Sequence, residues 1–178
     1  FDVLYFGNDR QSDRNKVLDS YFKKDLDLRK RWIGYIPKNY PNITTSPYLL
    51  REELIKNLNK SYSTFVVGDL HHYNNIKTVR FFESLMTDMI AFVHGPFDGG
   101  NFIQNPELRN YIIVNNIKEL TEKLNIYKND EPLFRKILKL QKDEVQRICG
   151  KYKLPFKLQK EEKLIIKKEV VKKPKPLF

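Results

Sequence analysis

Two arginines four positions apart follow a glycine turn at the end of an apolar strand. Residues 3–14 read "VLYFGNDRQSDR", in which Gly7 permits a tight turn and Arg10 and Arg14 come after it. A helix that begins near Ser12 would hold Arg14 in its first turn and Arg10 just before it. Because a helix N-terminus attracts anions and guanidinium groups bind them strongly, this spacing predicts an anion site.

The residues alone leave a second interpretation of this loop open. Asn8 tolerates unusual backbone angles, as a ligand-binding turn requires, but Asp9 and Asp13 stand beside the two arginines. Arg10 and Arg14 are therefore either anion ligands or surface groups paired with these two carboxylates.

A second pair of charged residues lies about seventy positions further on. In "KTVRFFESL", Arg80 and Glu83 are three residues apart on a predicted helix and share one face. An arginine neutralises a phosphate oxygen, and a carboxylate accepts two hydrogen bonds from a vicinal diol such as a ribose. The pair fits the two polar parts of a nucleotide, and the alternative is an intrahelical salt bridge.

Three further residues have suitable chemistry in predicted loops. Ser46 precedes Pro47, so we expect it to be extended and to expose its main-chain N–H and C=O groups to a base. Asp69 and Asp98 follow apolar segments, and we interpret them as carboxylates that approach a metal ion bound to a diphosphate.

The elements that must position these residues alternate between strand and helix. This alternation predicts an α/β fold, a Rossmann-like parallel sheet with helices on both faces, whose ligands bind outside the carboxyl ends of the strands. We expect strands at 2–7, 63–69, 89–95 and 110–116, and a further strand within 27–36 that ends near Ile33 and Gly34. Helices are expected at 12–22, 51–59, 77–86, 117–127 and 130–152, and loops at 40–50, 70–75 and 95–100.

Length and charge limit the domain organisation and the partners. With 178 residues and 40% hydrophobic content, the chain is long enough for one buried core, which we assign to residues 1–156. Residues 157–178 read as a lysine-rich tail, and the first residue, Phe1, indicates a piece of a longer protein. The net charge of +11 favours a polyanion or an anionic small ligand.

Cysteine content and hydropathy exclude two classes of protein. Cys149 is the only cysteine, which excludes a disulfide framework within the chain and favours a reducing compartment such as the cytoplasm. No apolar run approaches the roughly 20 residues that span a bilayer, so we expect no membrane partner.

The order of these motifs carries a resemblance to a known family. The segments "DVLYFGNDRQSDR", "WIGYI", "SPYLL", "STFVVGDLHHYNN", "KTVRFFESLMTDMIAFVHGPFD" and "YIIVNNIKELTEKLN" resemble, over residues 1 to about 150, the C-terminal domain of GT-B glycosyltransferases. They are most similar to the members from T-even bacteriophages that transfer glucose from UDP-glucose to hydroxymethylated bases in DNA.

The resemblance implies a UDP-sugar donor and a role for each site residue. The diphosphate would be bound by Arg10, Arg14, Arg80, Gly7, Asn8 and Tyr73 (or His72, since the alignment is ambiguous by one), the ribose by Glu83, and the uracil by Ser46, Ile33 and Gly34. A divalent metal, Mg²⁺ or Mn²⁺, is a further possible cofactor.

The resemblance also implies what this chain lacks. The catalytic base and most of the DNA-binding groove belong to an N-terminal domain, so we expect no catalytic residue here, no turnover by this chain alone, and duplex DNA as the partner of the whole protein. Two other interpretations stay open: a GT-B transferase domain that acts on a protein, glycan or lipid, and a non-catalytic nucleic-acid-binding module.

Overall fold

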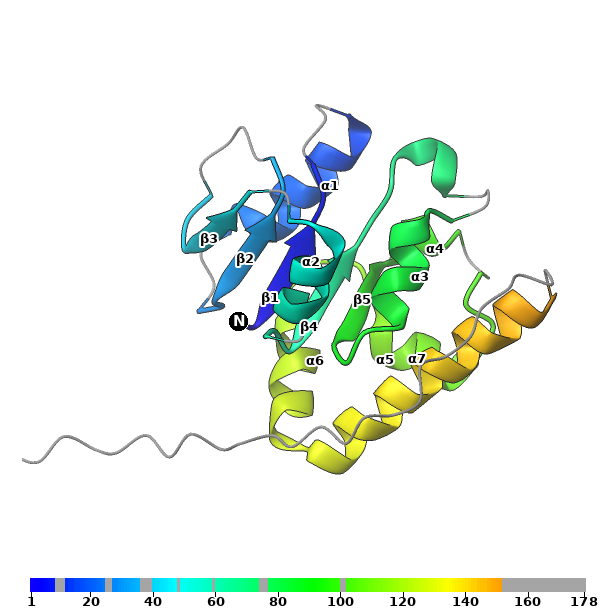
Figure 1. Ribbon diagram of the computed structural model, residues 1–178. Coiled ribbons are helices and arrows are strands. Elements are labelled where there is room, and N and C mark those ends of the chain that lie inside the picture. Colours follow the sequence, from blue (N-terminus) through cyan, green and yellow to red (C-terminus); the bar gives the residue numbers. More distant parts are fainter. Residues whose placement is uncertain are drawn as a thin grey trace, which may run out of the picture.

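The computed structural model describes residues 1–8, 12–24, 27–35, 40–47, 49–58, 60–73, 77–99 and 102–151. Arg10 and the predicted tail at 157–178 lie outside these residues. Figure 1 shows one twisted sheet with helices packed on both of its faces and a long final helix along one side. Among the described residues, no helix is long and apolar enough to cross a lipid bilayer.

Six strands form the sheet, and every pair of neighbours is parallel. Their order is β3-β2-β1-β4-β5-β6. The strands are β1 (Val3–Phe6), β2 (Lys30–Ile33), β3 (Ile43–Ser46), β4 (Ser63–Val66), β5 (Ile90–His94) and β6 (Ile113–Val114). This arrangement confirms the predicted α/β fold class.

The direction in which the chain adds strands reverses between β1 and β4. From β1 it proceeds outward through β2 and β3, and it then returns to place β4 on the other side of β1. In an open parallel sheet this reversal leaves a crevice at the carboxyl ends of the two central strands, where ligands bind. The loops after β1 and β4 contain Gly7 and Asp69, so the topology brings predicted site residues to this crevice.

Helices cover both faces because the strand side chains alternate between two apolar environments. Val3 and Tyr5 pack in the larger core cluster, whereas Leu4 and Phe6 belong to a smaller cluster with Leu58. The helical elements are α1 (Asp13–Phe22), α2 (Arg51–Leu58), η1 (Leu70–His72), α3 (Val79–Leu85), α4 (Gly95–Asp98), α5 (Pro106–Ile112), α6 (Ile117–Asn129) and α7 (Glu131–Lys151).

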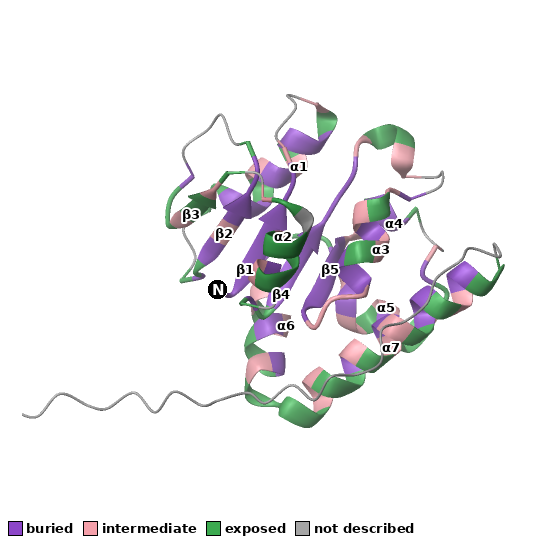
Figure 2. Ribbon diagram, in the orientation of Figure 1, coloured by how far each residue is buried: buried purple, intermediate pink, exposed green. Residues whose placement is uncertain are grey.

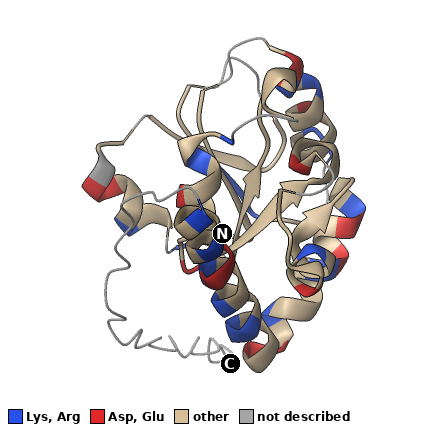
Figure 3. Cartoon of the chain, turned by 90° about the vertical axis from the view of Figure 1, so that its right-hand side faces the viewer, with Lys and Arg blue, Asp and Glu red and all other residues tan. Residues whose placement is uncertain are grey.

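Burial and charge follow the same division between sheet and surface. The strands are buried along most of their length, and the outer helix faces are exposed (Figure 2). Lys30 and Arg31 are the only charged residues in the described strands, whereas basic and acidic side chains mix along the helices (Figure 3). The charged residues of the described structure therefore lie mainly on the helices and loops.

Three local predictions are wrong. In each case the surroundings of the segment in the fold decide its structure, and not its amino-acid composition. Residues 40–50 are not all loop, since Ile43–Ser46 forms the edge strand β3, which is largely exposed and therefore shows no buried apolar pattern. Within the predicted strand at 110–116, residues 110–112 belong to α5, and Ile113–Val114 alone form the strand β6. The Asn105 side chain caps α5 by accepting from Leu108 N–H at 3.0 Å. Part of the loop predicted at 95–100 is the short helix α4.

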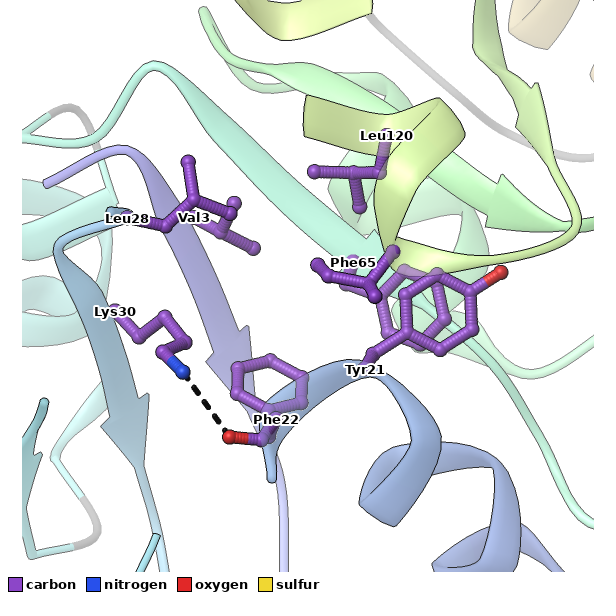
Figure 4. A pocket seen from close by; sticks show the side chains of 8 residues that line it. Val3, Tyr21, Phe22, Leu28, Lys30, Phe65 and Leu120 are labelled. Atoms are coloured by element: carbon purple, nitrogen blue, oxygen red, sulfur yellow. Dashed lines mark hydrogen bonds between the residues drawn. The ribbon is translucent and has the colours of Figure 1, made fainter. Parts of the chain in front are cut away.

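A small apolar cavity lies between the sheet and the helices α1 and α6, away from the carboxyl ends of the strands. Figure 4 shows its lining between α1, β2 and α6, with Tyr21 and Phe65 in contact and Lys30 at the wall. The Lys30 ammonium donates to the carbonyls of Phe22 at 3.1 Å and Lys24 at 2.8 Å, beyond the end of α1. The cavity has no room for a water molecule, so it belongs to the core.

Asp2 ties the start of β1 to two other segments. Its carboxylate accepts from the Arg29 backbone N–H at 2.8 Å and from Lys128 Nζ of α6 at 2.6 Å. Burial would raise the Asp2 pKa, but hydrogen bonds from Lys128 and Arg29 outweigh that effect and lower the pKa to about 2. The folded protein therefore favours the ionised carboxylate.

We predict that Asp2→Asn destabilises the protein at neutral pH by about 2 kcal/mol. Because the folded pKa is depressed, this stabilisation is present above the unfolded value of 3.8 and is lost as the pH falls through about 2. The measurement is urea unfolding at pH 7 and at pH 3. The exposed Asp27→Asn is the control, and equal losses for the two variants at pH 7 would contradict the assignment.

Candidate functional site

Two glycine turns pack against each other at the carboxyl ends of β1 and β2. Gly7 (φ 149°) and Gly34 (φ 128°) both have backbone angles that favour glycine. Gly7 N–H donates to Ile33 C=O at 2.8 Å, and the Trp32 indole donates to Gly7 C=O at 2.9 Å. A Cβ atom on Gly34 would lie 2.5 Å from the Gly7 carbonyl oxygen, so only glycine fits there.

Asn8 connects this pair of turns to α1. Its side-chain Oδ1 accepts from the Tyr35 backbone N–H at 2.9 Å, and its backbone carbonyl accepts from Arg14 Nη2 at 2.7 Å. Arg14 is only 7% exposed, and its Nε has no hydrogen-bond partner among the described residues. Arg14 is therefore not a surface group and makes no salt bridge with Asp13, while Asp9, the other carboxylate considered as its partner, lies outside the described residues.

Arg80 reaches the same turn from α3. Its Nη1 lies 2.5 Å and its Cζ 2.7 Å from the position that a Cβ on Gly7 would occupy. The guanidinium carbon also lies 5.7 Å from the centre of the Phe6 ring at the end of β1. Glycine at position 7 therefore leaves the space that Arg80 fills.

The Arg80–Glu83 pair does not form an intrahelical salt bridge. Glu83 is exposed on α3, and no described residue makes a salt bridge or a side-chain hydrogen bond with it. Since Arg80 turns toward Gly7, the salt-bridge interpretation of this R-x-x-E sequence is wrong, and the Glu83 carboxylate is available to a ligand.

Ser12 and Asp69 join the loops after β1 and β4. Ser12 is the N-cap of α1 and Asp69 the N-cap of η1, yet neither side chain caps its own helix. Instead, the Ser12 hydroxyl donates to Asp69 Oδ1. Burial would raise the Asp69 pKa, but the Ser12 hydrogen bond and the positive charge of Arg14 outweigh it, and the pKa is lowered.

A buried lysine fixes the loop that contains Tyr73. Lys77 donates to the carbonyls of His72 at 2.8 Å and Tyr73 at 2.7 Å, and also to the carbonyl of Phe97. The Tyr73 ring packs edge-on against the Phe97 ring at 5.8 Å. One ammonium group thus holds the end of η1 and the end of α4 together, and it fixes the backbone of Tyr73.

Ser46 only partly matches its predicted role. The residue is extended at the end of β3 as expected, but its carbonyl accepts from Gly34 N–H at 2.9 Å, so the prediction that both main-chain groups are exposed is wrong for the carbonyl. The Ser46 hydroxyl accepts from Arg31 at 3.1 Å. Ile33 is buried at the end of β2, which lies between β3 and β1 in the sheet.

Asp98 has a structural role instead of the predicted one near a metal. It is 1% exposed, its Oδ1 accepts from Ile103 N–H at 3.1 Å, and its Oδ2 forms an ion pair with Arg109. Both oxygens are occupied, so this carboxylate fixes the segment after α4. Among the described residues, no group of three or more His, Cys, Asp or Glu side chains could hold a metal ion.

The structure thus brings Gly7, Asn8, Arg14 and Arg80 together at the carboxyl edge between β1 and β4. Glu83 lies on the same helix as Arg80, while Arg10 lies outside the described residues. Sequence reasoning missed the Ser12–Asp69 hydrogen bond, because no sequence pattern relates two polar residues 57 positions apart. Arg14 and Arg80 therefore supply this edge with two positive charges.

Comparisons with known proteins agree with this arrangement. No family model matches the chain. The chain is 25% identical over 159 residues to the DNA beta-glucosyltransferase of Enterobacteria phage T4, a match that covers 84% of this chain and 44% of that protein. The chain therefore spans less than half the length of this relative.

Solved structures share the fold. T4 phage BGT in complex with its UDP-glucose substrate superimposes with a TM-score of 0.69 at 20% identity, covering 84% of this chain and 45% of that one. The same protein in complex with UDP and Mn²⁺ gives a TM-score of 0.68 at 20% identity, covering 84% and 44%. These matches confirm the predicted resemblance and the GT-B fold, and the relative and its solved structures are glycosyltransferases.

We predict that Gly34→Ala destabilises the protein by about 1–3 kcal/mol, because a Cβ atom would meet the Gly7 backbone and the φ angle is strained. Gly150→Ala is the matched control: it lies in α7 with nothing within 4 Å of a new Cβ, and we expect a gain of about 0.5–1 kcal/mol. Urea unfolding measures both. Equal stability of the Gly34 variant and the parent would contradict the glycine contact.

Proposed function

We propose that this chain is the donor-binding half of a glycosyltransferase and binds a UDP-sugar at the carboxyl edge between β1 and β4. The observation that carries the proposal is the convergence of Arg14 and Arg80 on the Gly7–Asn8 turn. Neither arginine forms a salt bridge with a described carboxylate. Two cations without an ion-pair partner among the described residues, at a topological switch point, favour a diphosphate ligand.

The site residues keep their predicted roles within this proposal. The diphosphate is bound by Arg10, Arg14, Arg80, Gly7, Asn8 and Tyr73, the ribose by Glu83, and the uracil by the ends of β2 and β3 at Ile33, Gly34 and Ser46. The N-terminus of α1 contributes backbone N–H groups to the proposed diphosphate site. These groups have no side-chain cap, since the Ser12 hydroxyl is hydrogen-bonded to Asp69.

The chemistry of sugar transfer explains why the proposed diphosphate site contains arginines. The leaving diphosphate gains negative charge in the transition state, and preorganised guanidinium groups stabilise that charge. The acceptor hydroxyl must be deprotonated by a general base that faces the sugar. We assign that base to an N-terminal domain outside this chain, so this chain binds the donor and does not turn it over.

The acceptor in this proposal is a hydroxymethylated base in phage DNA, and the transferred sugar is glucose, as the name of the T4 relative suggests. A base within a duplex must be flipped out before its hydroxyl can reach the sugar. The net charge of +11 favours contacts to DNA phosphates in the whole protein, which would act in the cytoplasm of the infected host.

The burial of Arg14 argues against a non-catalytic nucleic-acid module that uses these arginines as backbone contacts. At 7% exposure, the Arg14 side chain cannot reach across a solvated surface to the phosphates of a duplex. A small anion that enters the crevice fits this burial better. If the acceptor is not DNA, the proposed donor site in this chain stays the same, because the acceptor is bound by the part of the protein outside this chain.

We predict that UDP raises the melting temperature of this chain by about 5–10 °C at 100 times its Kd, which corresponds to about 2.7 kcal/mol. No response to UDP or UDP-sugars, together with clear binding to duplex DNA, would overturn the proposal.

The same titration tests the ribose contact. Glu83→Ala should weaken UDP binding about tenfold or more, because it removes hydrogen bonds to a charged group, and should leave the melting temperature of the free protein unchanged. Glu122→Ala, which removes an exposed glutamate of α6, is the control. Equal UDP affinities of the two variants would show that Glu83 does not contact the nucleotide.

A further inference from the structure

His94 ends β5 at the carboxyl edge of the sheet, next to the proposed UDP-sugar site. Val93 pairs with Val66 of β4, so His94 lies one position further along, beside the segment that leads into Asp69. The proposed uracil contacts lie at the ends of β3 and β2, and the proposed diphosphate contacts lie at β1 and β4. In the order of the strands β5 comes next, where a sugar attached to the diphosphate would lie.

The hydrogen bonds around Tyr21 fix the tautomer of His94. The Tyr21 hydroxyl donates its single proton to the carbonyl of the fully buried Val114 at 3.1 Å, and its oxygen lies 3.3 Å from His94 Nδ1. Because its proton is already used, this oxygen can only accept from the ring. Nδ1 therefore carries the imidazole proton, and Nε2 keeps an unshared electron pair as long as the ring is neutral.

The His94 ring is neutral at pH 7, and its second nitrogen is accessible. Burial lowers the pKa of His94 to about 4. Nε2 has no hydrogen-bond partner among the described residues, and unlike the unpartnered Nδ1 of His72 it is not buried. His94 thus presents one hydrogen-bond acceptor of fixed direction at the carboxyl edge of the sheet.

A neutral acceptor selects a chemical group different from the one that the arginines bind. An unprotonated imidazole nitrogen only accepts, as phosphate oxygens do, so Nε2 cannot form a hydrogen bond with the diphosphate. Its partner must donate, and hydroxyl groups are the donors that a sugar offers. The ribose hydroxyls belong to Glu83 in the proposed function, which leaves the hydroxyls of the transferred sugar.

We propose that His94 Nε2 accepts a hydrogen bond from a hydroxyl group of the transferred sugar, and that Tyr21 is the residue that positions this ring. The inference rests on the proposed function, because the bound nucleotide brings the sugar to β5. The contact contributes to binding only while a sugar is attached. UDP-glucose and UDP therefore differ in their dependence on His94.

The test is calorimetric titration of this chain with UDP-glucose and, separately, with UDP. Asparagine places its amide nitrogen near the position of Nδ1 and has no atom at Nε2, whereas the amide of glutamine reaches the position of Nε2. His94→Asn should weaken UDP-glucose binding by about three- to tenfold, the contribution of one hydrogen bond, and leave the Kd of UDP unchanged. His94→Gln should lose less, because its carbonyl oxygen can accept from the sugar.

A second pair of variants tests the positioning role of Tyr21. Tyr21→Phe removes the oxygen that accepts from Nδ1, so the imidazole proton can move to Nε2, and binding of UDP-glucose but not of UDP should weaken. Tyr62→Phe makes the same change at an exposed tyrosine next to the amino end of β4, and it should match the parent for both ligands.

An unchanged Kd of UDP-glucose in His94→Asn, or an equal loss of affinity for UDP-glucose and UDP, would overturn this inference and leave the proposed UDP site standing. No binding of UDP by the parent would overturn both proposals.

Discussion

The contact between the backbones of Gly7 and Gly34 is the constraint on which the candidate site depends. It brings the turns after β1 and β2 so close that a side chain on either residue would collide, with Arg80 at one glycine and with the Gly7 carbonyl at the other. Asn8 then stands where it can accept from both Tyr35 and Arg14. The lack of a side chain at Gly7 leaves the space that Arg80 fills, and the lack of one at Gly34 lets the two turns meet.

The arginines of the site form no ion pair with a described carboxylate. Most ion pairs of the described structure lie elsewhere, for example between Arg135 and Glu131 along α7. Arg14 donates to a backbone carbonyl, and Arg80 lies over an aromatic ring. Asp69, the carboxylate after β4, is hydrogen-bonded to Ser12 rather than to an arginine.

The fold could be predicted from the sequence because it depends on local patterns. Alternating strand and helix periods were enough for the parallel sheet, and Arg14 and Arg80 lie at its carboxyl edge as expected, while their roles and that of Glu83 stay predictions. The edge strand β3 was missed because exposed threonines carry no apolar alternation. The Ser12–Asp69 and Lys77 contacts were missed because they join segments whose proximity arises only when the sheet forms.

The Lys77 ammonium has a consequence for how tightly the crevice can bind. Its three carbonyl acceptors hold the segment from His72 to Tyr73 in the free protein, and the side chain itself is 4% exposed. Backbone that is already fixed in the folded protein loses little conformational entropy in a binding event. His72 and Tyr73 are fixed in this way before any ligand binds.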